Sequence, residues 1–373
     1  MIAFVRRNIE AQYRVELNIF PAFNQLKPFE PIAYPIEQHP TPGEALEVAP
    51  GVRWARMPLP FELNHINLWL LEEADGWTVV DTGLNLDDIK RHWEAVLATH
   101  CRAKPVKRII VTHCHPDHLG LAHWLGQKTG AGTWITQGEL LNAYAWFHQL
   151  PNYDVAGMVG FFRRHGLDEA RAALLCGRGP TYRGRVDGLP IEYRRLIDGD
   201  HLRIGGRDWR IIVGYGHSPE HASLYCAELD VLISGDMLLP RISTNVSAMS
   251  SNPDGDPIRL FLDSIACFET LPDATLVLPS HGHPFRGVHE RVEQLRRHHD
   301  ERFDALVAAC TAPKSACELI PTLFNRELDA HQIMFAMGES IAHLNYLEHA
   351  GRLRRTLDAG VFRFTATQEK GEV

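Results

Sequence analysis

The sequence predicts an α/β fold, because short apolar runs typical of β-strands alternate with segments of helical periodicity. Asp75-Gly76 joins two apolar runs as in a β-hairpin, and residues 87–98 place apolar side chains on one face of a helix. Polar residues follow directly after several of the apolar runs. The 373 residues are enough to bury a large core and to form one large and one small domain.

The composition is that of a soluble globular protein, with 45% hydrophobic and 23% charged residues. A net charge of −8 gives no overall attraction to nucleic acid or to an anionic membrane. No apolar run approaches the roughly 20 residues of a membrane helix, and the N-terminus lacks a signal-peptide pattern. The seven cysteines include no CxxC pair and suggest no disulfide framework, so a cytoplasmic location is predicted.

Changes in composition and in secondary-structure pattern along the chain predict three structural segments. Residues 1–45 contain six prolines and are expected to form an irregular N-terminal arm. Residues 46–295 alternate between strand and helix patterns and should form the main domain, with a helical insertion at residues 138–199. Residues 296–373 follow the order helix, helix, helix, hairpin, which is typical of a winged helix.

The segment 112–120 concentrates potential metal ligands, because histidine and aspartate are common ligands of divalent metals. In an extended turn the first two histidines point the same way, and the aspartate and third histidine can reach a second point nearby. One loop could therefore supply two adjacent metals with His113, His115, Asp117 and His118. The side chain of Cys114, between the first two histidines, is expected to point into packing.

Four further polar residues follow short apolar runs in the same way: Asp81, His217, Asp236 and His281. Ligands at the carboxyl ends of strands converge on one edge of an open α/β sheet. The sequence therefore predicts a metal site at that edge. His/Asp sites accept Zn, Fe or Mn, and zinc is the expected metal.

These motifs resemble those of the metallo-β-lactamase-fold hydrolase superfamily over roughly residues 46–290. The resemblance rests on Asp81-Thr82-Gly83, Thr112 to His118, Gly216-His217-Ser218, Ser234-Gly235-Asp236 and Ser280-His281-Gly282. The tail is similar to the winged-helix extension in the branch with human β-lactamase-like protein 2, an endoribonuclease. The resemblance implies a four-layer αββα sandwich with a helical insertion and a winged-helix-like C-terminal domain. Residues 46–295 would then be the catalytic domain.

The resemblance also implies a dinuclear centre. The first metal would be held by His113, His115 and His217. The second would be held by Asp117, His118 and His281, with Asp236 bridging and Asp81 orienting a ligand from behind. Two such metals can share one hydroxide, and Asp117 would act catalytically by holding that hydroxide or accepting its proton.

Nearby residues and the insertion bear on the substrate. His221 is expected to orient its loop or to contact substrate, and Tyr215 either packs in its strand or donates to an oxyanion. Nearly a hundred residues separate His118 from His217, more than in most relatives, so the insertion should shape the pocket. Residues 161–195 contain eight arginines and four acidic residues, which predicts either an anionic small-molecule substrate or merely solvated helix faces.

Several functions remain open. The leading hypothesis is a hydrolase of an ester or thioester with an anionic part, as in the glyoxalase II-like thioesterases. The alternative is a phosphodiesterase or endoribonuclease, although the tail from Glu301 contains ten acidic and eight basic residues. The tail could instead be an interaction module or form a homodimer. A mononuclear iron oxygenase would not need Asp117, His118 and His281.

Overall fold

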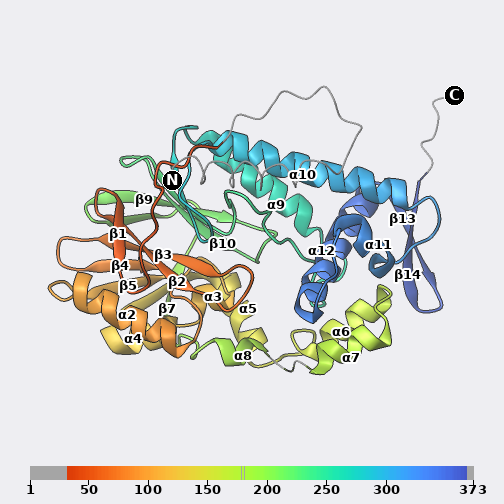
Figure 1. Ribbon diagram of the computed structural model, residues 1–373, viewed down its shortest axis with the longest axis horizontal. Coiled ribbons are helices and arrows are strands. Elements are labelled where there is room, and N and C mark those ends of the chain that lie inside the picture. The colour runs from red at the N-terminus through yellow and green to blue at the C-terminus, as the bar shows by residue number, and fades with distance from the viewer. Residues whose placement is uncertain (1–31, 178, 180, 368–373) are drawn as a thin grey trace, which may run out of the picture. The chain divides into compact units, whose positions relative to one another are not determined.

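The computed structural model describes residues 32–177, 179 and 181–367 (Figure 1). Most of the predicted N-terminal arm, residues 1–31, lies outside the described residues. Residues 32–44 form no strand of their own, and the backbone N–H of Arg286 donates to the carbonyl oxygen of Ala33 (2.9 Å). The described end of the predicted arm therefore contacts the rest of the chain, and β1 is the first strand.

The first sheet contains seven strands whose order in space is their order in the chain. Strands β1 to β4 are antiparallel, whereas β4 to β7 are parallel and are separated by helices such as α2 (Asp87–His100) and α4 (Ala122–Thr129). The strands are β1 (Ala45–Ala49), β2 (Val52–Pro58), β3 (His65–Glu72), β4 (Trp77–Val80), β5 (Val106–Ile110), β6 (Gly132–Thr136) and β7 (Tyr193–Leu196).

The second sheet contains five strands in the order β12-β11-β10-β9-β8. Only β11 and β12 pair in parallel, with helix α9 (Pro257–Ala266) between them in the chain. Strands β9 and β11 both pair antiparallel with β10, so β9, β11 and β12 all run in one direction. The strands are β8 (His201–Ile204), β9 (Arg207–Gly214), β10 (His221–Cys226), β11 (Val231–Gly235) and β12 (Leu276–Pro279).

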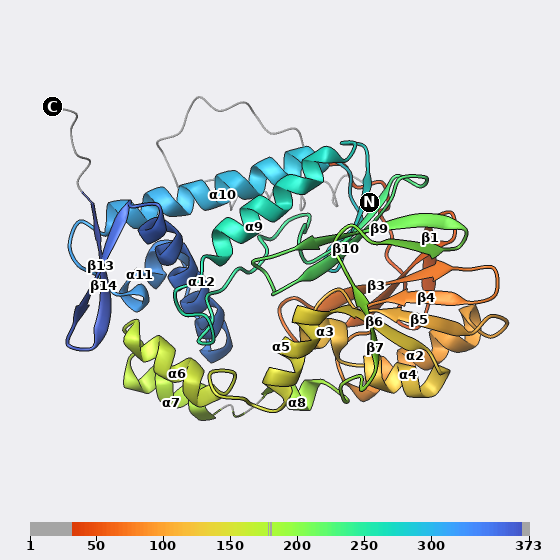
Figure 2. The same ribbon diagram turned by 180° about the vertical axis from the view of Figure 1, so that it is seen from behind.

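Each sheet packs against helices on its outer face and against the other sheet on its inner face, so the fold has the four layers of an αββα sandwich. In β3, Leu68 and Leu70 pack with α2 on the outer face, whereas Trp69 and Leu71 face the second sheet. In β11, Leu232 packs in the cluster that contains α9 and α10 (Val288–Ala309). Figure 2 shows α9 and α10 beside the second sheet and α2 and α4 beside the first. The predicted fold class is therefore confirmed.

The insertion is helical as predicted, but it ends in a strand that the sequence analysis missed. It contains α5 (Gln137–Phe147), α6 (Val155–Arg164), α7 (Glu169–Gly177) and α8 (Thr181–Arg185), and then β7 pairs with β6. Residues 193–195 of this edge strand are exposed, so no apolar alternation marks it. Backbone hydrogen bonds pair it with β6, and the Arg194 guanidinium carbon lies 5.3 Å from the centroid of the Trp134 ring.

The C-terminal segment has the predicted order of elements: α10, α11 (Ala316–Leu323), α12 (Ala330–His349), β13 (Leu353–Asp358) and β14 (Val361–Ala366). Helix α10 continues without a break across residues 295 and 296, so the domain boundary and the winged-helix assignment stay predictions. Within the described part of the chain, no helix is long and apolar enough to span a membrane.

Candidate metal centre

The fold brings all seven predicted ligand residues into two neighbouring groups. His113, His115, His217 and Asp236 form the first group, and Asp117, His118 and His281 form the second. Within each group the potential ligand atoms lie within 4.8 Å of one another. Each residue follows a strand end: β5 precedes the histidine-rich loop and the short helix α3 (Pro116–Leu119), while β9, β11 and β12 precede the others.

Ring nitrogens converge in the first group. The Nε2 atom of His113 lies 2.9 Å from His115 Nδ1 and 3.2 Å from His217 Nε2. Asp236 Oδ2 lies 3.4 Å from His217 Nε2. Because Zn–N bonds are about 2.0–2.1 Å long, donor atoms at these separations can share one ion.

Two buried polar atoms at the second group, one of them from Asp236 of the first group, lack hydrogen-bond partners. His118 Nε2 and Asp236 Oδ1 make no hydrogen bond within the described chain, although both are inaccessible to solvent. They lie 3.6 Å apart, and His281 Nε2 is 3.5 Å from Asp236 Oδ1 and from Asp117 Oδ2. Buried polar atoms are normally satisfied, so a cation between these donors fits the residues present.

Asp236 connects the two groups because its two carboxylate oxygens face different ones. Oδ2 faces His217, and Oδ1 faces His118 and His281. This orientation is the one that a bridging ligand requires. The seven side chains therefore fit two metals, with Asp236 shared.

Burial and charge set the protonation of these groups. Burial lowers the pKa of His113 well below its ordinary value and that of His115 to about 3, which favours the neutral imidazoles that bind metals. Burial opposes charge on His118 too, but Asp81, Asp117 and Asp236 together raise its pKa well above its ordinary value. The carboxylates thus create a site that favours a positive charge, whether a proton or a metal ion.

Asp81 lies behind His118, as predicted. Its Oδ2 atom is 2.7 Å from His118 Nδ1 and accepts a hydrogen bond from the Thr112 hydroxyl (2.8 Å), while its Oδ1 atom accepts one from the Thr112 backbone N–H (2.8 Å). Carboxylates in such positions fix the tautomer and the orientation of a ligand imidazole. With Nδ1 engaged by Asp81, the Nε2 atom of His118 is left for the second group.

His221 and Tyr215 lie outside both groups. His221 is buried, and its Nε2 atom accepts from the backbone N–H of Asp236 (3.1 Å), so it orients this loop and does not face substrate. Gly235 is required beside it, because a Cβ there would lie 2.3 Å from the His221 ring. Tyr215 is 41% exposed, so the expectation that it packs in its strand is wrong, and its oxyanion role stays a prediction.

Glu139 in α5 is a site residue that the sequence analysis missed. Its carboxylate is fully buried and accepts from Cys114 N (2.9 Å), Ser218 Oγ (2.6 Å) and Glu220 N (2.7 Å). It therefore joins the loop of His113 and His115 to the loop of His217. Only the three-dimensional contacts distinguish it from an ordinary helix-start glutamate. Cys114 is buried in apolar packing, as predicted.

The C-terminal segment also supports the ligands, through residues 244–248. Thr244 Oγ1 donates to the carbonyl oxygen of Asp236 (2.6 Å), and His217 Nδ1 donates to that of Asn245 (2.8 Å). Helix α12 supports this loop, because the carbonyl oxygen of Gly338 accepts a hydrogen bond from the backbone N–H of Ala248 (3.0 Å). The tail is thus part of the structure that positions the site.

Comparisons with known proteins agree with this geometry. Residues 62–281 match the metallo-beta-lactamase superfamily, and residues 303–367 match the metallo-beta-lactamase-like C-terminal domain. A beta-lactamase domain protein from Burkholderia ambifaria has a similar crystal structure, with a TM-score of 0.84, 46% identity and coverage of 90% of this chain and 98% of that one.

Two curated relatives are more distant. The probable metallo-hydrolase YqjP of Bacillus subtilis is 25% identical, with 79% of this chain and 91% of that protein aligned. A linear primary-alkylsulfatase of Pseudomonas is also 25% identical, over 61% of this chain and 43% of that protein. With this fold, these clustered side chains and these matches, the chain belongs to the metallo-β-lactamase superfamily and is a metallo-hydrolase with that superfamily's C-terminal domain.

Proposed function

We propose that this protein is a dinuclear metal-dependent hydrolase that acts on an ester or thioester with an anionic part. The observation that carries the proposal is Asp236, whose two carboxylate oxygens face two separate groups of ligand side chains. Zinc is the expected metal, since imidazole and carboxylate donors suit it, and Fe or Mn are the alternatives.

The chain's residues have separate roles in this proposal. His113, His115 and His217 would hold the first metal, and Asp117, His118 and His281 the second. When bound, two metals lower the pKa of a water molecule and polarise the scissile group. The Asp117 side chain is 21% exposed whereas the His118 side chain is fully buried, so Asp117 is the ligand best placed to accept a proton from incoming water.

Two observations bear on the substrate. The name of the Pseudomonas relative describes an enzyme for sulfate esters, which contain an anionic group beside the bond that is cleaved. In the insertion, Arg163 pairs with Glu169 (2.6 Å) and Arg171 with Asp168 (3.2 Å), so local ion pairs already engage part of the basic region. These two arginines are therefore already paired, and in this proposal the metals contribute to recognition of the anionic part.

Metal analysis of the purified protein tests the dinuclear site. The wild type should contain two divalent ions per chain, while His217→Ala and His281→Ala should each lose one, from different groups. A wild type with a single ion, unaffected by His281→Ala, would overturn the dinuclear assignment. The metal-loaded protein is then assayed with acyl-thioesters, lactones, aryl esters and alkyl sulfates, and inactivity on the whole panel would refute the proposed reaction.

A phosphodiesterase or endoribonuclease is the second candidate, suggested by the winged-helix-like tail with its basic residues Arg352, Arg354 and Arg355. Acidic partners engage two of them: Arg352 pairs with Asp304 (2.8 Å), and Arg355 with Asp254 (2.7 Å). These pairs reduce the positive charge available for a nucleic-acid backbone. A gel shift with single-stranded RNA at low salt decides the point. A homodimer and a cytoplasmic location stay predictions.

A further inference from the structure

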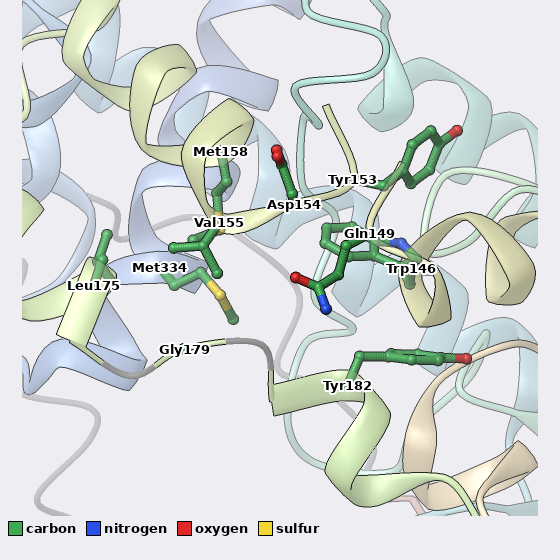
Figure 3. A pocket seen from close by; sticks show the side chains of 10 residues that line it. All are labelled: Trp146, Gln149, Tyr153, Asp154, Val155, Met158, Leu175, Gly179, Tyr182 and Met334. Carbon is green, nitrogen blue, oxygen red and sulfur yellow. The ribbon is translucent and has the colours of Figure 1, made fainter. Parts of the chain in front are cut away.

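A pocket lies between the insertion and helix α12, apart from the residues of the two metal-ligand groups (Figure 3). Helices α5, α6, α7 and α12 all contribute to its walls. The lining residues are Trp146, Gln149, Tyr153, Asp154, Val155, Met158, Leu175, Gly179, Tyr182 and Met334. We infer that this pocket binds an aliphatic chain of the substrate whose reactive group lies at the metal centre. The inference rests on the proposed function.

A direct contact joins the pocket to the metal-ligand loop. The Tyr182 ring lines the pocket, and its hydroxyl donates to the carbonyl oxygen of Cys114 (2.6 Å), the residue between His113 and His115. Helix α5 makes the same connection, because Glu139 near its start binds Cys114 N and Trp146 near its end lines the pocket. Glu139 and Trp146 are thus separated by roughly 10 Å along α5, a length that an extended aliphatic chain can span.

The chemistry of the walls favours an aliphatic chain. Met158 and Met334 are flexible and polarisable, and such side chains adapt to chains of different length. Trp146 and Tyr153 pack edge to face with ring centroids 5.6 Å apart and supply a rigid apolar wall. Figure 3 shows Val155 from α6 and Met334 from α12 facing the same space.

The acidic side chain in the lining already has a structural role. The carboxylate of Asp154 caps α6 by accepting from the Gly157 backbone N–H (2.8 Å). Gln149 is neutral, and among the lining residues that the structure describes there is no lysine, arginine or histidine. These described walls therefore offer little to a second charged group, whereas burial of each methylene group raises affinity about three- to fourfold.

The substrate series that tests this inference consists of 4-nitrophenyl esters from acetyl to decanoyl, hydrolysed by the metal-loaded full-length protein. We expect kcat/KM to rise with chain length by about two- to fourfold per methylene until the pocket is filled. Val155→Trp fills the space and should lower the decanoyl-to-acetyl ratio of kcat/KM at least tenfold. Ala156→Trp, on the exposed side of the same helix turn, is the matched control and should retain the wild-type ratio.

Measuring the binding of a fatty acid, which is not hydrolysed, tests the pocket independently of the reaction. Titration calorimetry should show that decanoate binds to wild type and binds at least tenfold more weakly to Val155→Trp, whereas acetate should show no binding that depends on Val155. Met334→Ala, which removes the opposite wall, should also weaken decanoate binding and replaces Val155→Trp if that variant does not fold.

The possible outcomes separate the pocket from the reaction. Hydrolysis without chain-length preference, or equal decanoyl-to-acetyl ratios in Val155→Trp and wild type, overturns the inference and leaves the proposed function standing. Val155-dependent decanoate binding without hydrolysis of any ester supports the pocket and contradicts the proposed reaction. Failure of decanoate to bind, with no hydrolysis, overturns the inference.

Discussion

The Nδ1 atom of His217 donates a hydrogen bond to the carbonyl oxygen of Asn245 across 2.8 Å. This bond assigns the ring tautomer, because a carbonyl can only accept, and it leaves Nε2 free to face His113. The loop of Asn245 in turn rests on α12. The hydrogen bond between Ala248 and Gly338, far apart in the chain, thereby helps to set the geometry of the metal centre.

Gly338→Ala should disturb this support. A Cβ at position 338 would lie 2.8 Å from the Cβ and Oγ atoms of Ser247, so α12 or the loop must move. We expect a loss of about 1–3 kcal/mol in the free energy of unfolding, together with weaker metal binding at the His217 group. Urea unfolding and chelator competition measure the two effects.

Gly160→Ala is the matched control, because no atom lies within 4 Å of a Cβ placed at this position in α6. Alanine should leave stability unchanged or raise it by up to about 1 kcal/mol, since glycine is a poor helix former. Equal behaviour of the two alanine variants would contradict the proposed role of the α12 contact.

Asp81→Asn should weaken metal binding at the second group. The substitution removes the charge beside His118 Nδ1 and places an amide where Thr112 and His118 donate. Loss of such an orienting carboxylate lowers metal affinity about 10–100-fold. Competition with a chelator measures the affinity, and Asp75→Asn, in a surface ion pair with Lys107 (2.8 Å), is the control. Unaltered metal affinity in Asp81→Asn would show that the Asp81 carboxylate does not orient His118 for metal binding.

Glu139→Gln should destabilise the joined loops. The carboxylate accepts three hydrogen bonds, and an amide nitrogen in place of one oxygen would face the donors of Cys114, Ser218 or Glu220. A buried unsatisfied donor costs about 1–3 kcal/mol, so the urea midpoint should fall. Ser218→Ala, which removes one donor and leaves the carboxylate, should cost less. A urea midpoint unaffected by Glu139→Gln would show that the Glu139 carboxylate does not hold the two loops together.

His299 in α10 should make stability depend on pH. Burial lowers its pKa from 6.5 to about 3, with Arg302 acting in the same direction. Between these values the unfolded chain binds a proton that the folded chain does not, so stability falls as the pH drops from 6.5 toward 3. The slope from this residue is at most about 1.4 kcal/mol per pH unit.

Urea unfolding of wild type and His299→Gln at pH 7.5 and pH 5 checks this dependence. Glutamine cannot be protonated in this range, so the variant should lose less stability on acidification than wild type does. Identical losses in the two proteins would show that His299 does not contribute to the acid sensitivity.

The sequence predicted those parts of the site that depend on local pattern. An apolar run followed by a polar residue marks a strand end wherever it occurs, so Asp81, Asp236 and His281 could be found without coordinates. The edge strand β7 has no apolar face and could not be found in this way. The burial of Glu139 depends on two loops that reach it from distant parts of the chain.

By itself, the sequence determined the α/β fold class, the strand ends and the candidate ligand residues that follow them, because periodicity and side-chain chemistry are local properties; the resemblance to the family implied which seven would bind metal. Tertiary structure alone decided that the two oxygens of Asp236 face different groups, that His221 lies behind the site, and that α12 supports His217. These relationships depend on how separate strands and helices pack, and the periodicity of a single segment does not encode that packing.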